Sequence, residues 1–228
     1  MSTFARPSAA PLALSASTEA QTYGLFAFAI AMTTVGAWLG IVYLPVVFAA
    51  SLPLFLVELV LILTSQWWSR TAPLNYLLFA LFPLISGFTI IPYVLSIAQQ
   101  YENGTTIVLS ALSATVCMAL AGAVAVKSLG LKMQWMGRAL LFSVLGLVVL
   151  GLLQLFVPSL RTTGFELALS GAGVVVFALF TAYDIQRITE QARLGANPFL
   201  LALRLYLDIF NMFVYLLRFM TALSGNRR

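Results

Sequence analysis

A stripe of polar side chains runs along the last apolar segment of the chain, Leu203 to Met220, which reads LRLYLDIFNMFVYLLRFM. The polar positions are spaced four, three, four and three residues apart. This spacing places them on one face of an α-helix, over about 21 Å at roughly 1.5 Å per residue. Ionised groups in lipid are costly, so this face is expected to point at a protein interior or an aqueous path. The five residues are Arg204, Asp208, Asn211, Tyr215 and Arg218.

A second aspartate is expected to meet Asp208. Asp184 lies in FALFTAYDIQRI, near the end of the preceding apolar segment. Consecutive segments joined by a short loop form antiparallel helices, so both aspartates fall in the same half of the bundle. Two carboxylates in one low-dielectric site cannot both ionise cheaply, so the pair would share a proton or bind a cation. A hard cation such as calcium suits carboxylates supplemented by backbone carbonyls and water.

An alternative explanation of the two aspartates is helix packing alone. Each carboxylate would then pair with a nearby arginine, such as Arg187 or Arg204, and hold two helices together. The spacing leaves both explanations open, and the distance between the two carboxylates distinguishes them.

Three other charged residues are candidates for interior contacts. Glu58 lies mid-segment in LPLFLVELVLIL with no charged residue near it in sequence, and Arg218 lies deep in the last segment. Because either charge would be costly alone, we expect Glu58 and Arg218 to form a buried ion pair. Arg204 is expected to extend to the membrane interface. Arg70 either locks the aspartates by a salt bridge or anchors the interface beside two tryptophans.

The absence of histidine excludes several kinds of chemistry. Ser-His-Asp and Cys-His catalysis, histidine-ligated metals and histidine pH switches all need this residue. A single cysteine, Cys117, excludes an internal disulfide and a cysteine-rich metal site. We therefore expect no catalytic residues and no enzymatic activity, and no cofactor other than calcium as a permeant or bound ion. The four remaining carboxylates are expected to be solvated or interfacial: Glu19, Glu102, Glu166 and Glu190.

The composition predicts an integral membrane protein. Of 228 residues, 61% are hydrophobic and 8% are charged, whereas ordinary soluble domains have roughly 45–50% and about 25%. Long apolar runs such as LLFSVLGLVVLGLLQLFV lack the alternation of a β-barrel strand, which favours an all-α fold. Seven segments are long enough to span a membrane: 23–44, 46–68, 74–98, 105–126, 139–157, 164–186 and 199–223.

The basic residues predict the orientation of these segments. With seven spans, seven basic residues fall on the amino-terminal side and three on the other, so the amino terminus is expected in the cytoplasm and the carboxyl terminus outside. A re-entrant last segment would instead place the tail inside. The net charge of +5 therefore needs no nucleic-acid partner. Residues 1–22 are expected to be a disordered tail, and residues 23–228 the transmembrane domain.

Several of these segments together resemble the transmembrane Bax inhibitor motif family, and its bacterial branch most closely. The run YDIQRI in the sixth segment, followed by LYLDIFNMFVYLLRFM in the seventh, is similar to the carboxyl-terminal signature of that family. SGFTIIPYV at 86–94 is similar to its third span, and Glu58 stands where its second span carries an acidic residue. The resemblance covers essentially everything from Tyr23 onward.

The resemblance implies a fold and a function. It implies six helices packed around a central seventh, with a calcium leak regulated by pH. By this resemblance, Asp184 and Asp208 would form the proton-sensing and cation-binding pair, and Glu58 and Arg218 the interior ion pair. Arg70 would be a latch that engages the aspartates in the closed state. A bacterial inner membrane is the implied location, with lipids, calcium or protons, and other membrane proteins as partners.

Two other functions compete with a cation leak. A non-conducting regulatory protein would use its buried charges only to hold helices together, and partner proteins would supply the activity. An intramembrane aspartyl protease would use two aspartates on adjacent spans to activate water. The second aspartate stands in LYLDIF, without the glycine-flanked GxGD setting of such proteases, and no PAL motif follows. The protease is therefore the weakest of the three hypotheses.

Overall fold

The chain folds into long α-helices connected by short turns, as the apolar segments predict. A computed structural model describes residues 10–129 and 136–225. Its elements are α1 (Ala10–Val42), α2 (Leu44–Leu63), α3 (Ser65–Trp68), α4 (Leu74–Gln100), α5 (Gly104–Leu129), α6 (Met136–Phe156), the 3₁₀ turn η1 (Pro158–Leu160), α7 (Thr163–Arg193) and α8 (Pro198–Ser224).

Seven of these helices are long and apolar enough to cross a membrane, with mean hydropathies from 1.7 to 2.6. The prediction of an all-α protein with seven membrane-spanning helices is confirmed in this respect. Large apolar side chains cover their outer faces; Trp38, Phe48 and Phe142 are 62%, 64% and 70% exposed. Such surfaces are stable in contact with lipid and costly in water. The chain is therefore a multi-pass membrane protein.

Two predicted boundaries differ from the structure. The second span ends at Leu63, because a turn at Thr64 separates α2 from the short α3. The first helix begins at Ala10, inside the predicted tail of residues 1–22, and residues 1–9 lie outside the described part of the chain. Within the predicted tail, Thr22 is fully buried, and Glu19 accepts a hydrogen bond of 3.0 Å from Thr189 on α7, so these residues belong to the helical bundle.

Glycines let two pairs of helices approach closely. A side chain at Gly36 of α1 would collide with the backbone of Leu84 on α4. A side chain at Gly87 of α4 would collide with the backbone of Thr33 on α1. A side chain at Gly173 on α7 would collide with the ring of Tyr215 on α8. Small residues at such positions allow membrane helices to pack backbone to backbone.

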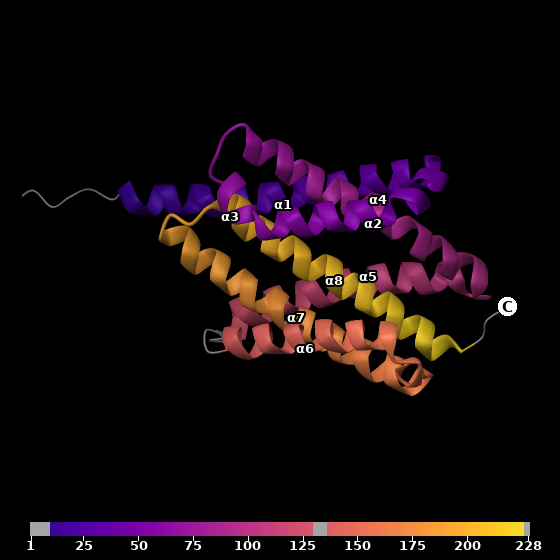
Figure 1. Cartoon of the computed structure of the whole chain (residues 1–228). Coiled ribbons are helices and arrows are strands. Elements are labelled where there is room, and N and C mark those ends of the chain that lie inside the picture. The colour runs from indigo at the N-terminus through magenta and orange to yellow at the C-terminus, as the bar shows by residue number, and fades with distance from the viewer. Residues whose placement is uncertain (1–9, 130–135, 226–228) are drawn as a thin grey trace, which may run out of the picture.

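The last helix, α8, is the most buried of the seven spans. Half of the residues in its apolar 18-residue stretch are buried, whereas the corresponding share is 11–39% in the other spans. It packs against α1, α4, α5 and α7. In Figure 1 it crosses the molecule diagonally, with α1, α2 and α4 on one side and α6 and α7 on the other. The polar stripe is therefore carried by a helix with protein on several sides, as the cost of charge in lipid requires.

The two ends of α8 lie in different surroundings. At its start, Asn197 accepts a hydrogen bond from the backbone of Phe199 at 2.9 Å and donates one to the carbonyl of Ser69 at 2.8 Å. The α7–α8 turn is therefore joined to the end of α3. The chain leaves α8 at the opposite end of the bundle, where Gly225 adopts the left-handed conformation that commonly ends a helix (Figure 1).

Seven alternating spans predict that the two ends of the chain lie on opposite sides of the membrane. Alkaline phosphatase, which is active only outside the cytoplasm, should be active when fused after Arg228. The same enzyme inserted at Gly195 in the α7–α8 turn should be inactive. An active Gly195 fusion together with an inactive carboxyl-terminal fusion would contradict the orientation expected from the basic residues.

Candidate functional site

The structure brings Asp184 of α7 and Asp208 of α8 together. Both side chains are buried, with 6% and 8% of their surface exposed. Their carboxyl groups lie close enough to interact through a side-chain hydrogen bond. The second carboxyl oxygen of Asp208, Oδ2, is buried and has no hydrogen-bond partner among the described residues. Buried polar atoms normally have partners, so this oxygen is available to a proton, a water molecule or a cation.

Arg204 and Arg187 are the positive charges that act on this pair. Arg204 lies one helical turn before Asp208, and its positive charge attracts both carboxylates. The positive charge of Arg187 attracts the carboxylate of Asp184. Neither arginine forms a direct ion pair with an aspartate in the described part of the chain. Arg187 instead lies 5.8 Å from the centre of the Tyr183 ring. With the Gln191 amide oriented to suit it, Arg187 also donates hydrogen bonds of 2.6 and 2.9 Å to that residue.

This arrangement argues against the packing explanation in its simplest form. If the aspartates served only to hold helices through arginine, direct ion pairs would be expected. The structure instead places carboxyl against carboxyl, which costs free energy unless a proton or cation is held between them.

The carboxyl pair has few of the ligands of a resident calcium site. Calcium normally takes six to eight oxygen ligands, and the described residues contain no group of three or more histidine, cysteine, aspartate or glutamate side chains that could hold a metal ion. The charges of Arg187 and Arg204 nearby also oppose a divalent ion. The pair therefore fits a proton or a passing cation better than a permanently bound one.

Arg70, the predicted latch, is not in contact with the aspartates here. It lies exposed between α3 and α4, beside Ser69, whose carbonyl binds Asn197. This places Arg70 at the same end of the bundle as the start of α8. The structure thus brings the loop of Arg70 near the α7–α8 turn but leaves its side chain in a different environment from the carboxyl pair.

Glu58 belongs to a polar network in the middle of the bundle. Ser86 of α4 donates a hydrogen bond to Glu58 of α2 at 2.5 Å. Ser86 also interacts with the hydroxyl of Tyr206 on α8. That hydroxyl is 2.8 Å from the hydroxyl of Thr33 on α1. The network joins four helices, and Tyr206 within it is 1% exposed.

The prediction that Arg218 pairs with Glu58 is wrong. Arg218 is bound by Glu166 of α7, through Nε to Oε1 at 2.7 Å and Nη2 to Oε2 at 2.9 Å. Gln154 of α6 accepts a hydrogen bond from Arg218 at 3.1 Å and donates one to Glu166 at 2.8 Å. We call these three residues the outer cluster. Glu166 was expected to be merely interfacial, whereas it is the charge partner of the last helix.

A signal for this pairing was present in the sequence. Helices α7 and α8 are antiparallel, so the register that brings Asp184 to Asp208 also brings Glu166, eighteen residues earlier, towards the end of α8 that carries Arg218. Glu58 lies five residues before the end of α2 and is connected through Ser86 to Tyr206, which is twelve residues before Arg218 on α8. Depth along the helix therefore decides which carboxylate pairs with Arg218.

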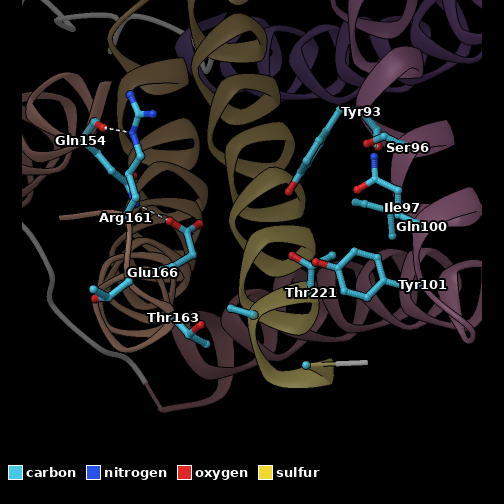
Figure 2. A pocket seen from close by; sticks show the side chains of 13 residues that line it. Tyr93, Ser96, Ile97, Gln100, Tyr101, Gln154, Arg161, Thr163, Glu166 and Thr221 are labelled. Atoms are coloured by element: carbon cyan, nitrogen blue, oxygen red, sulfur yellow. Dashed lines mark hydrogen bonds between the residues drawn. The ribbon is translucent and has the colours of Figure 1, made fainter. Parts of the chain in front are cut away.

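A polar pocket of about 540 Å³ opens at the Arg218 end of the molecule. Gln154, Arg161 and Glu166 lie on one side of it, facing Tyr93, Tyr101 and Thr221 across the space (Figure 2). Neither aspartate lines it. The polar groups of α8 therefore form two separate sites, the carboxyl pair near its start and the outer cluster near its end.

Comparison with known proteins identifies the family. The family model described as Inhibitor of apoptosis-promoting Bax1 matches residues 16–226. The chain belongs to this family. It is 34% identical to the uncharacterized protein Cj0236c of Campylobacter jejuni, over 90% of this chain and 88% of that protein. An uncharacterized protein of Deinococcus radiodurans is 34% identical over 87% of each chain. The inner membrane protein YbhL of Escherichia coli is 26% identical over 92% of this chain and 91% of that protein.

Family membership agrees with the resemblance carried by the YDIQRI and LYLDIF runs. The match extends over all seven spans and includes both aspartates and the whole of α8. The match therefore covers every residue of the carboxyl pair and of the outer cluster in this Bax inhibitor family protein.

The pairing of Arg218 predicts which glutamate matters more for stability. Glu166→Gln should lower the free energy of unfolding by ~1–2 kcal/mol, because it leaves a partly buried guanidinium without its counter-charge. Glu58→Gln should cost less, because an amide oxygen can still accept the hydrogen bond from Ser86. Thermal unfolding of both variants in the same detergent measures the difference, and a Glu58→Gln protein less stable than Glu166→Gln would contradict this ranking.

Proposed function

We propose that this protein is a pH-sensitive cation leak of the bacterial inner membrane, with calcium as the permeant ion. In this proposal α8 is the central axis of the bundle, and cations pass along its polar face. The observation that carries the proposal is the buried contact between Asp184 and Asp208, in which one carboxyl oxygen lacks a partner within the described chain.

The chemistry of a carboxyl pair supports sensitivity to pH. With one shared proton the pair carries a single negative charge, and without it the pair carries two. A change of one charge in a low-dielectric site alters the local potential strongly, so protonation would change both the attraction for cations and the packing of α7 on α8. Arg204 adds a fixed positive charge to the same site.

The choice of calcium and of the inner membrane has a separate basis. The carboxylates alone indicate a hard cation or a proton, and the choice of calcium among these follows from the family resemblance. The relative from Escherichia coli is described as an inner membrane protein, and seven apolar spans suit such a membrane. The bias of basic residues supports a cytoplasmic amino terminus, which puts the carboxyl pair in the cytoplasmic half.

Removal of either carboxylate should abolish the pH response. In liposomes containing a calcium-sensitive dye, the wild-type protein should pass calcium at a rate that changes with pH, because the carboxyl pair takes up and releases its shared proton. Asp184→Asn and Asp208→Asn should each flatten this profile. Glu102→Gln, a carboxylate outside the spans, is the matched control and should retain the wild-type profile.

Two outcomes of that assay would overturn the proposal. Unchanged profiles in both aspartate variants would remove the carboxyl pair from the mechanism. A wild-type protein that carries no flux at any pH, yet copurifies with another membrane protein, would favour the non-conducting regulatory function.

Arginine variants test the roles of the nearby charges. Arg204→Gln should move the midpoint of the pH profile, because its charge acts on both carboxylates. The latch role of Arg70 requires a second conformation in which its side chain reaches the pair. Arg70→Gln should then also move the midpoint, and a profile identical to that of the wild type would exclude the latch.

A further inference from the structure

We propose that Gln154, Glu166 and Arg218, the outer cluster, form a charge-operated gate at the far end of α8, closed in this structure. The inference rests on the proposed cation leak and adds a second control point to it. The gate lies about 15 Å from the carboxyl pair, since Arg218 follows Asp208 by ten residues at roughly 1.5 Å each.

The contacts of Arg218 close the outer cluster. Its guanidinium binds both oxygens of Glu166, at 2.7 and 2.9 Å. A bidentate pair of this kind fixes the orientation of both side chains as well as attracting them. Gln154 contacts both partners, so α6, α7 and α8 are held together at one point.

Water and ions can reach the cluster from the polar pocket. Glu166 and Gln154 line the pocket, and the side chains of Glu166 and Arg218 are 26% and 24% exposed. The opposite wall presents the side chains of Tyr93, Tyr101 and Thr221 (Figure 2). A cation that enters the pocket would therefore lose little hydration before it meets the cluster.

Beyond the cluster the path is closed by apolar packing. The guanidinium of Arg218 lies 5.4 Å from the centre of the Tyr215 ring, and that ring stacks on Phe177 at 5.5 Å. On α8, the buried residues Leu216 and Met212 belong to the same apolar cluster as Phe177. The pocket lining includes no described residue of α8 before Thr221, so this apolar layer lies between the pocket and the carboxyl pair.

The charges of the cluster predict opposite effects for its two members. A cation that leaves the pocket meets the positive charge of Arg218, which Glu166 neutralises only while the two are paired. Removal of Arg218 would take away the barrier and leave a free carboxylate that attracts cations. Removal of Glu166 would leave an uncompensated positive charge in the same place.

Flux measurements on two amide variants test the sign of these effects. At fixed pH, Arg218→Gln should raise calcium flux into liposomes by roughly tenfold, and Glu166→Gln should lower it by a similar factor. Arg138→Gln is the matched control. Arg138 is an exposed arginine at the start of α6 and does not line the pocket, so the variant removes the same charge elsewhere and flux should remain near that of the wild type.

The result separates a gate from a structural contact. If the cluster only stabilises the fold, both variants lose the same interaction and should shift flux in the same direction, which would overturn the gate while leaving the leak intact. Opposite shifts support it.

Thiol labelling tests the gate even if the protein conducts nothing. The native Cys117 is exposed on α5, so the probes are placed in a Cys117→Ala background. Thr221→Cys, in the pocket, should react with a membrane-impermeant thiol reagent. Asn211→Cys, beyond the apolar layer, should react only when Arg218→Gln is also present. Equal reaction of Asn211→Cys with and without Arg218→Gln would contradict a gate at Arg218, whatever the flux.

Discussion

The structure depends on the cost of charge inside a membrane protein. One helix, α8, carries two arginines and an aspartate through the interior, and each must be compensated. The compensation differs at its two ends. Arg218 is neutralised by a carboxylate in direct contact, which makes a stable ion pair. Asp208 instead faces another carboxylate, which is stable only with a proton or cation. The first arrangement is suited to holding helices and the second to responding to the medium.

This difference separates the roles of the polar groups along α8. Between the two ends lies packing that is apolar or neutral, formed by Met212, Leu216 and Leu217. The Tyr206 network joins α8 to α1, α2 and α4 through hydroxyl groups and Glu58. Movement of α8 along its own axis would disturb the carboxyl pair, the Tyr206 network and the outer cluster together. A change of charge at the aspartates is therefore in a position to affect the whole helix.

The sequence predicted the fold well because long apolar segments have few alternatives. The seven spans, the hairpin of α7 and α8, and the interior position of Asp208 follow from hydropathy and helical spacing. The contact of Asp184 with Asp208 followed from the short loop between their helices. The tail boundary at residue 22 was not predicted correctly, because Glu19 and Thr22 join the bundle through tertiary contacts that have no local signal.

The partners of the charged side chains on neighbouring helices could not be predicted from the sequence. Glu58 and Arg218 were paired because neither had an obvious neighbour, yet Ser86 and Glu166 are their partners. A serine that binds a carboxylate has no distinctive pattern. The prediction of an interfacial Glu166 is wrong, although the antiparallel register places it towards the same end of α8 as Arg218. Arg70 is likewise exposed, and its assignment as a latch came from family resemblance alone.

The central claim is that Asp184 and Asp208 act as a single proton- or cation-sensitive unit. A double-mutant cycle on the pH dependence of calcium flux in liposomes tests this most directly. If the two carboxylates act as one unit, the double variant Asp184→Asn/Asp208→Asn should show the same flattened profile as either single variant. If the effects of the two substitutions add independently, or if no variant differs from the wild type, the pair is not the sensor.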